Sequence, residues 1–357
     1  MNPHPIYDIK KSYLENAEEG PFFEGNMPTR LVLPQDKWKD FLGFKVASKI
    51  GVPAGPLLNS RWVSFAAKAG FDIVTYKTIR SKEHPAHPVP NMVYVETKGF
   101  LKPEQEGETL VATNVPSKNM NELALTNSFG IPSRDPKYLV EDIAKAKAAL
   151  NPGQVMIVSV VGTPRPGEDF VEDFVVASRL ALEGGAEIIE ADFSCPNVLS
   201  CEGSIHTNPD SVFTISSKIT KAIGHVPLVI KVGVIQSEEV LKRVMIAAAK
   251  AGVKAICGIN TLSMRVVNKE GAPALGENRL RAGVCGGPIR MAALEFIEKA
   301  RRINDQEILG LTIMATGGIT ESVHFDLFLD KGAHVALTGI GMMWDPYLAM
   351  RYHNARK

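Results

Sequence analysis

From about residue 45 onward, short apolar runs rich in β-branched residues alternate with stretches whose apolar residues recur at helical spacing. Asp135–Leu150 illustrates the second kind, because its apolar residues fall on one side of a helix and Asp-Pro supplies a cap and a first residue. The same pattern predicts helices at Phe170–Glu183, Asp210–Ile223, Ser237–Ala251 and Pro288–Ile303. Strands and helices in alternation predict a parallel sheet covered by helices.

Nine runs have the character of strands, one more than an eight-stranded barrel holds. They are Ala47–Ala54, Ile73–Lys77, Leu123–Asn127, Val155–Val160, Ala186–Phe193, Val226–Val232, Ala255–Asn260, Leu311–Thr316 and His334–Thr338. The segment from about 80 to 134 is rich in Pro and Asn and shows no convincing helix. We therefore assign Leu123–Asn127 to an insertion after the second strand that caps the barrel mouth.

The predicted fold class is α/β, a (β/α)8 TIM barrel. Residues 1–44 form an N-terminal extension packed on the barrel, and residues 45–357 form the barrel with its insertion. The alternative is an open doubly wound sheet, which favours a Gly-rich turn after the first strand. The segment Val52–Pro56 does not supply the G-x-G-x-x-G pattern.

Composition excludes several classes of protein. The 357 residues include 40 Lys plus Arg against 39 Asp plus Glu, so no basic surplus indicates nucleic acid. Four cysteines form neither a disulfide framework nor a zinc pattern, so we expect no metal and a reducing, cytoplasmic setting. The polar N-terminus is unlike a signal peptide, and no apolar run reaches the ~20 residues that span a bilayer.

Polar residues follow the predicted strands where a barrel places its active site. The fourth strand runs into Asp192, Ser194, Cys195 and Asn197 around a proline. A lone cysteine is more often a packing residue, but the other strand ends favour chemistry here. They carry Ala54, Gly55, Lys77, Thr78, Ser159, Lys231, Asn260 and Thr261, and the insertion adds Asn127, Ser128, Phe129 and Gly130.

Glycines after the last two strands indicate a phosphate site. Thr316-Gly317-Gly318 and Thr338-Gly339 leave backbone N–H groups exposed near a helix start, and Gly286-Gly287 is a further candidate. Lysines at strand ends, Lys77 and Lys231, are costly to bury without a purpose. A phosphate cradle with two lysines predicts a large anionic ligand, and flavin mononucleotide (FMN) fits.

Together these motifs resemble the dihydroorotate dehydrogenase family of FMN-dependent barrels, including the pyrimidine-reducing domain of dihydropyrimidine dehydrogenase. The resemblance covers about residues 45–350 and implies oxidation of a dihydropyrimidine such as dihydroorotate. Cys195 matches the catalytic base and Lys77 the lysine that bridges flavin and substrate. The resemblance assigns FMN to Ala54, Gly55, Lys77, Thr78, Ser159, Lys231, Asn260, Gly286, Gly287, Thr316, Gly317, Gly318, Thr338 and Gly339. It assigns the substrate to Lys77, Asn127, Ser128, Phe129, Gly130, Asn197, Asn260 and Thr261.

The family resemblance also implies a homodimer and, because the chain has no dinucleotide motif, another chain for any route to NAD. Asp192 departs from the pattern, which has asparagine three residues before the base. A carboxylate only accepts hydrogen bonds, so Asp192 leaves two alternatives open. One is a related flavin barrel acting on another cyclic or conjugated carbonyl substrate. The other is a flavin-binding barrel without turnover, or one that needs a partner chain to pass electrons.

Overall fold

Eight parallel strands close into a barrel in the computed structural model, which describes residues 5–30, 33–194 and 205–356. The predicted barrel is confirmed. In order around the barrel, the strands are β3 (Ile50–Val52), β4 (Ile73–Ile79), β8 (Val155–Val160), β9 (Ile188–Asp192), β10 (Leu228–Lys231), β11 (Ala255–Gly258), β14 (Thr312–Thr316) and β15 (Val335–Leu337).

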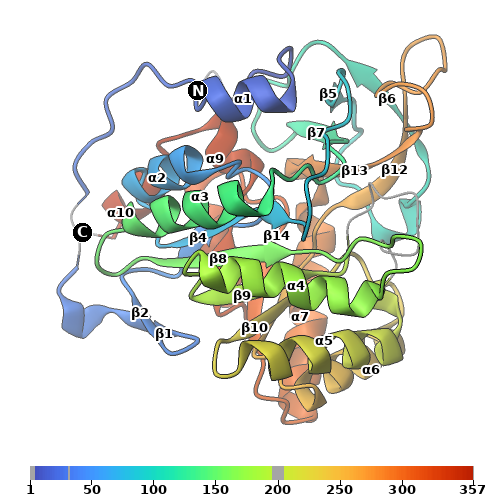
Figure 1. Cartoon of the computed structure of the whole chain (residues 1–357). Coiled ribbons are helices and arrows are strands. Elements are labelled where there is room, and N and C mark those ends of the chain that lie inside the picture. The colour runs from blue at the N-terminus through green and yellow to red at the C-terminus, as the bar shows by residue number, and fades with distance from the viewer. Residues whose placement is uncertain (1–4, 31–32, 195–204, 357) are drawn as a thin grey trace.

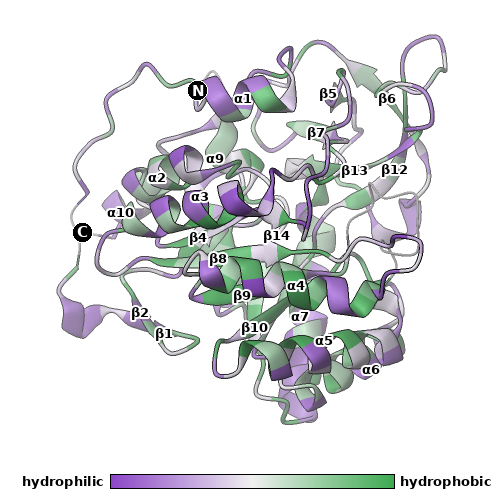
Figure 2. Cartoon of the chain, viewed as in Figure 1, coloured by the Kyte–Doolittle hydropathy of each residue, from purple (hydrophilic) through white to green (hydrophobic). Residues whose placement is uncertain are grey.

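Helices cover the outside of the barrel, and most of them begin at a polar cap. Asn59, Asp135, Asp169, Asn208 and Ser237 each accept hydrogen bonds from the first backbone N–H groups of a helix. Figure 1 shows α3, α4 and α5 lying side by side across the strands, and Figure 2 shows apolar residues concentrated on those strands. The helices are α2 (Ser60–Lys68), α3 (Pro136–Ala148), α4 (Phe170–Glu183), α5 (Pro209–Ile223), α6 (Glu238–Lys250), α7 (Arg290–Gln306), α8 (Ser322–Asp330), α9 (Ile340–Trp344) and α10 (Leu348–Asn354).

A short hairpin closes the end of the barrel at which the strands begin, called here the amino end. It pairs β1 (Lys39–Phe41) with β2 (Phe44–Val46), and it packs Phe41 and Val46 into the core cluster formed by inward-facing strand residues. Asp72 is fully buried at this end and is held by Arg30 and Ser48. The amino end is therefore sealed by apolar packing around a paired charge.

The opposite, carboxyl end carries a second, five-stranded closed sheet. It consists of β5 (Met92–Val95), β6 (Thr109–Thr113), β7 (Ala124–Asn127), β12 (Leu262–Val267) and β13 (Arg281–Gly286). The expected insertion supplies β5, β6 and β7. A further insertion between β11 and α7 supplies β12 and β13, and the sequence pattern did not predict it. Figure 1 shows this sheet at the upper right, with the β1–β2 hairpin at the lower left.

The N-terminal segment crosses the outside of the barrel and places α1 (Tyr13–Glu19) beside α2. Ser12 and Glu15 form a capping box at the start of α1. Asn59 Nδ2 donates to Ala17 O at 2.6 Å, and Trp62 Nε1 donates to Asn16 O at 3.2 Å. Among the described helices none has the length and hydropathy to cross a membrane.

Candidate active site

Residues from different strand ends meet in two adjoining chambers at the carboxyl end of the barrel. We call them the glycine chamber and the lysine chamber after the residues that distinguish them. Parallel strands bring their carboxyl ends to one edge, which explains why residues far apart in sequence converge here. Both chambers are lined by Ala54, Gly55, Asn127, Phe129, Lys231, Asn260 and Thr261.

The glycine chamber adds Thr316, Gly317, Gly318 and Gly339 from the last two strands, and Gly286 from β13. Gly318 has a φ of +79°, and a Cβ there would lie 2.4 Å from Arg290 Cα. Only glycine suits such a position. Arg290 holds the loop by donating to Gly318 O at 3.3 Å and to Asn121 Oδ1 at 2.7 Å. Glycines of both predicted phosphate loops therefore line the same cavity, the glycine chamber.

The lysine chamber adds Lys77, Thr78, Gly130 and Asp192. Lys77 is buried, and its ammonium donates to the carbonyl oxygens of Thr78, at 2.9 Å, and Pro132. Burial, with a smaller contribution from Arg80, lowers the pKa of Lys77 from 10.5 to about 7. A buried lysine without a carboxylate partner holds its proton more tightly when an anion occupies the chamber.

Lys231 is nearly fully buried, and its Nζ donates to Ala54 O at 3.1 Å. On the adjacent strand β9, Asp192 lies directly opposite Lys231 in the strand register. The two strand-end lysines thus contribute positive charge from β4 and β10 to the same lysine chamber.

A small hydrogen-bond network fixes the chain as it leaves β9. Asp192 Oδ1 accepts from Ser194 N at 3.0 Å and from Ser194 Oγ at 3.2 Å. Asn260 Nδ2 donates to Ser194 Oγ at 3.2 Å. The predicted residues Cys195 and Asn197 follow directly and lie outside the described residues. The network therefore positions the residue that immediately precedes Cys195.

Four predicted site residues line neither chamber. Ser159 is fully buried and accepts a hydrogen bond from Thr78 Oγ1 at 3.1 Å, so it supports a residue that does line the site. Thr338 Oγ1 donates to Ile319 O at 2.6 Å, and Ser128 Oγ lies 3.1 Å from His87 Nδ1. Gly287 packs on the backbone of Asn121. These four residues therefore lie behind or beside the walls of the chambers.

Some lining residues were missed by sequence reasoning. Tyr7 and Tyr13 come from the N-terminal segment, Met92 from β5 and Cys285 from β13. The short apolar run Met92–Val95 is a signal that could have revealed β5, whereas the N-terminal segment shows no period. The extension and both insertions therefore complete the walls of the site.

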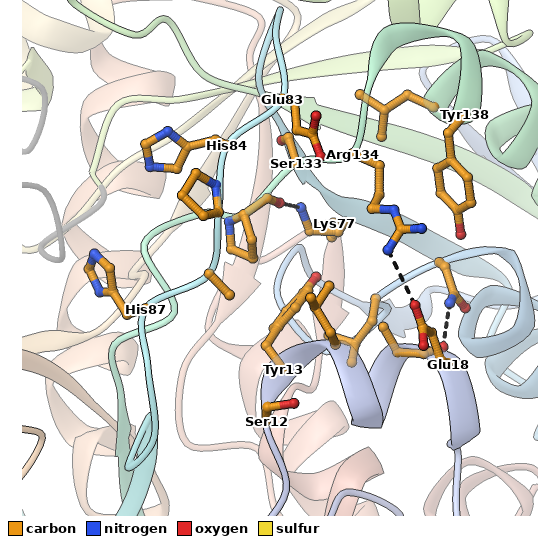
Figure 3. Close-up of a pocket in the computed structure, with 18 of the residues that line it drawn as sticks. Ser12, Tyr13, Glu18, Lys77, Glu83, His84, His87, Ser133, Arg134 and Tyr138 are labelled. Atoms are coloured by element: carbon orange, nitrogen blue, oxygen red, sulfur yellow. Dashed lines mark hydrogen bonds and ion pairs between the residues drawn. The ribbon is translucent and has the colours of Figure 1, made fainter.

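A larger outer chamber of about 360 Å³ adjoins the lysine chamber and shares Tyr13, Lys77 and Pro132 with it. Figure 3 shows Lys77 near its centre, with His84 and His87 on one side and Arg134 on the other. Burial, followed by Arg80, lowers the pKa of His84 to about 4, so this histidine is neutral at neutral pH. No group of metal-ligating side chains occurs among the described residues.

Comparison with known proteins gives a consistent result. The family model for dihydroorotate dehydrogenase matches residues 39–324. A protein named dihydroorotate dehydrogenase from Dictyostelium discoideum is 50% identical over 99% of this chain and 98% of its own length. A dihydroorotate dehydrogenase A (fumarate) from Lactobacillus helveticus is 30% identical over 48% of this chain and 54% of its own length.

A solved structure of dihydroorotate dehydrogenase from Eimeria tenella, in complex with ferulenol, has a TM-score of 0.66 to this chain. The similarity covers 87% of this chain and 81% of that one at 16% sequence identity, so it supports the fold. The family model and the full-length similarity together show that this chain belongs to the dihydroorotate dehydrogenase family.

Proposed function

We propose that this protein uses FMN to oxidise dihydroorotate to orotate. One observation carries the proposal. The residues that match the family motifs come from separate strand ends, and most of the described ones line the same pair of chambers. The Dictyostelium relative, 50% identical over nearly the whole chain, carries the name dihydroorotate dehydrogenase and supports the choice of substrate.

The residues present fit FMN. The Gly317–Gly318 turn offers backbone donors in a space that a Cβ would fill, which suits a phosphate. Thr261 lines both chambers, and its buried hydroxyl has no hydrogen-bond partner among the described residues. Lys231 would hold the pyrimidine edge of the ring. When bound, FMN would supply an acceptor for two electrons and one proton.

The residues of the chain itself handle the substrate and its proton. Cys195 takes a proton from the carbon beside the substrate carbonyl, and the positive charge of Lys77 and Lys231 favours its thiolate. Lys77 also attracts the substrate carboxylate. Asn127 and Asn260 offer both donors and acceptors to the planar ring. We also assign Asn197 to the substrate from its position in the motif.

Asp192 favours a second candidate, a related flavin barrel with another carbonyl substrate. It lines the lysine chamber and is nearly fully buried, yet its Oδ1 atom is occupied by Ser194. Asp192→Asn keeps the acceptor for Ser194 and removes the charge. If the charge excludes dihydroorotate, this variant reacts faster with it; an equal rate removes the second candidate.

We further propose a cytoplasmic homodimer whose reduced flavin is reoxidised either by a small molecule at the same site or through a partner chain. The Lactobacillus relative's name specifies fumarate, a small dicarboxylate. Two lysines and the asparagines of the lysine chamber suit such an anion. Reoxidation of the reduced enzyme by fumarate in the absence of any other protein distinguishes these routes.

The test of the proposed activity is anaerobic mixing of the flavin-loaded protein with dihydroorotate and, separately, with dihydrouracil. Bleaching of the flavin absorbance by dihydroorotate is expected, with release of orotate. Absence of bleaching by dihydroorotate would contradict the proposal. Cys195→Ser should retain FMN and react about 10²-fold or more slowly. Cys201→Ser, six residues away, is the matched control and should react at the unaltered rate.

A further inference from the structure

A carboxylate lies inside the barrel where no step above uses it. Residues of β9 alternate in direction, so Ile188, Glu190 and Asp192 face the barrel interior. Ile188 belongs to the apolar cluster at the amino end, and Asp192 lines the lysine chamber. Glu190 lies between them, with an exposed fraction of 0%. It is therefore sealed beneath the floor of the chamber.

Neither carboxylate oxygen of Glu190 makes a hydrogen bond of ordinary length within the described residues, although the Ser159 hydroxyl and the Cys257 thiol lie close enough to favour its ionised form. Its register partners are Ser159 on β8 and Val229 on β10. The charged groups that act on it are Lys231 from β10 and Asp192 from its own strand. Only Lys231 is a cation in this group. The interior therefore holds two carboxyl groups near one ammonium.

The charge state of Glu190 depends on this balance. A buried carboxylate without hydrogen bonds is costly, and a nearby anion increases that cost. Burial raises the pKa of Glu190 from 4.5 to about 6, with Lys231 opposing the shift and Asp192 adding to it. Any further negative charge placed beside Lys231 weakens the interaction that most favours the ionised form.

We propose that Glu190 is a positioning residue that binds a proton when the flavin is reduced, and so keeps the charge around Lys231 balanced. This inference rests on the proposed function. Two electrons and one proton would enter the bound flavin ring, which would leave the ring with one negative charge near Lys231. One proton from solvent then adds to the Glu190 carboxylate. Reoxidation removes the two electrons and the proton from the ring and returns the Glu190 proton to solvent.

The test is the midpoint potential of the bound flavin as a function of pH, measured by chemical reduction without substrate. For a two-electron couple, each proton taken up contributes about 30 mV per pH unit. Wild type should take up one proton below about pH 6 and two above it, which doubles the slope. Glu190→Gln should show the one-proton slope throughout. A one-proton slope for wild type on both sides of pH 6 would overturn the proposal.

Infrared difference spectra of reduced minus oxidised protein give a second readout that does not depend on turnover. Above about pH 6, wild type should gain the carbonyl stretch of a protonated carboxylic acid on reduction, and Glu190→Gln should lack this signal. Met314→Leu alters packing in the barrel interior at an apolar residue and leaves the carboxyl group in place, and it should retain both the signal and the slope. If Glu190→Gln fails to fold, the wild-type slope and spectrum still decide the question.

The two proposals fail differently. A protein that binds no flavin contradicts the proposed function. A protein that binds flavin and reacts with dihydroorotate, but shows neither the steeper slope nor the carboxylic acid signal, contradicts only the role of Glu190.

Discussion

The two ends of the barrel treat buried polar groups in opposite ways. At the amino end, the fully buried Asp72 accepts hydrogen bonds from Arg30 and Ser48 beneath a hairpin that excludes water. Toward the carboxyl end, the Thr261 hydroxyl has no hydrogen-bond partner among the described residues, and neither oxygen of Glu190 makes a hydrogen bond of ordinary length there. Lys77 there donates to carbonyl oxygens, which do not neutralise it.

This difference indicates that the amino ends of the strands serve stability and that their carboxyl ends serve binding and reaction. Buried polar groups are ordinarily hydrogen-bonded, because an unpaired one costs about 1–3 kcal/mol. The Asp72 carboxylate at the amino end meets this rule, although Nε of its partner Arg30 has no hydrogen-bond partner among the described residues. The carboxyl end departs from it around the chambers, where a ligand can supply the missing partners. Substitutions at the amino end should therefore affect unfolding, and substitutions at the carboxyl end should affect binding and reaction.

The largest effect on stability is expected from Asp72→Ala. It leaves the guanidinium of Arg30 buried without its carboxylate, which costs about 3–5 kcal/mol of unfolding free energy. Urea unfolding measures this loss. Lys45→Ala breaks an exposed pair with Asp40 on the same hairpin and should cost less than about 1 kcal/mol. If folded Asp72→Ala reduced its flavin much more slowly than wild type, the assignment of stability to the amino end and of reaction to the carboxyl end would be contradicted.

Lys77→Met should affect the reaction and leave the stability intact, which is the opposite of the effect expected for Asp72→Ala. Removal of the ammonium should slow flavin reduction by dihydroorotate at least about a hundredfold, or ~2.7 kcal/mol. The ligand-free protein should not lose stability, because the lowered pKa shows that burial disfavours the charged lysine. Stopped-flow absorbance and urea unfolding measure the two quantities. Lys82→Met, at an exposed lysine five positions later, is the control, and equal rates for both variants would contradict the prediction.

Glu190 predicts a pH dependence of stability. Its folded pKa of about 6 is raised above 4.5, so the protein binds this proton more tightly when folded. The contribution of this proton to the unfolding free energy is fully present below pH 4.5 and is lost as the pH rises through 6. Glu190→Gln avoids this loss. The unfolding free energy of Glu190→Gln minus that of ligand-free wild type should therefore be about 2 kcal/mol larger above pH 6 than below pH 4.5. Urea unfolding across that range would refute the prediction if the difference were constant.

Gly318→Ala should have the smallest effect. A methyl group there meets the Arg290 backbone and disturbs the phosphate loop, so FMN affinity should fall about tenfold, or ~1.4 kcal/mol. Gly167 has a similar φ of +77° but open space around it, which makes Gly167→Ala the control for backbone strain alone. Fluorescence titration of the apoprotein measures both affinities, and equal losses would remove Gly318 from the site.

The sequence predicted the barrel and much of its carboxyl end, because each strand is a short apolar run and parallel strands align their ends. It did not predict the five-stranded sheet. There β6 is only partly buried and pairs in parallel with β12, which comes from much later in the chain. No local pattern encodes such a pairing, since it depends on where the barrel places both insertions.

Individual site residues show the same limit. Strand-end positions such as Lys77 and Asn260 were predicted because their chemistry interrupts an apolar run. Tyr13 was not, because it reaches the lysine chamber from an extension without periodicity. Glu190 was visible as an acid within a strand, but its full burial near Lys231 and Asp192 became apparent only from the packed interior.

The most direct test of the contrast between the two ends is urea unfolding of the apoprotein with and without FMN. If the carboxyl end keeps polar groups for this ligand, FMN at about 100 times its dissociation constant should raise the unfolding free energy by ~2.7 kcal/mol. An unfolding free energy that saturating FMN leaves unchanged would contradict the account.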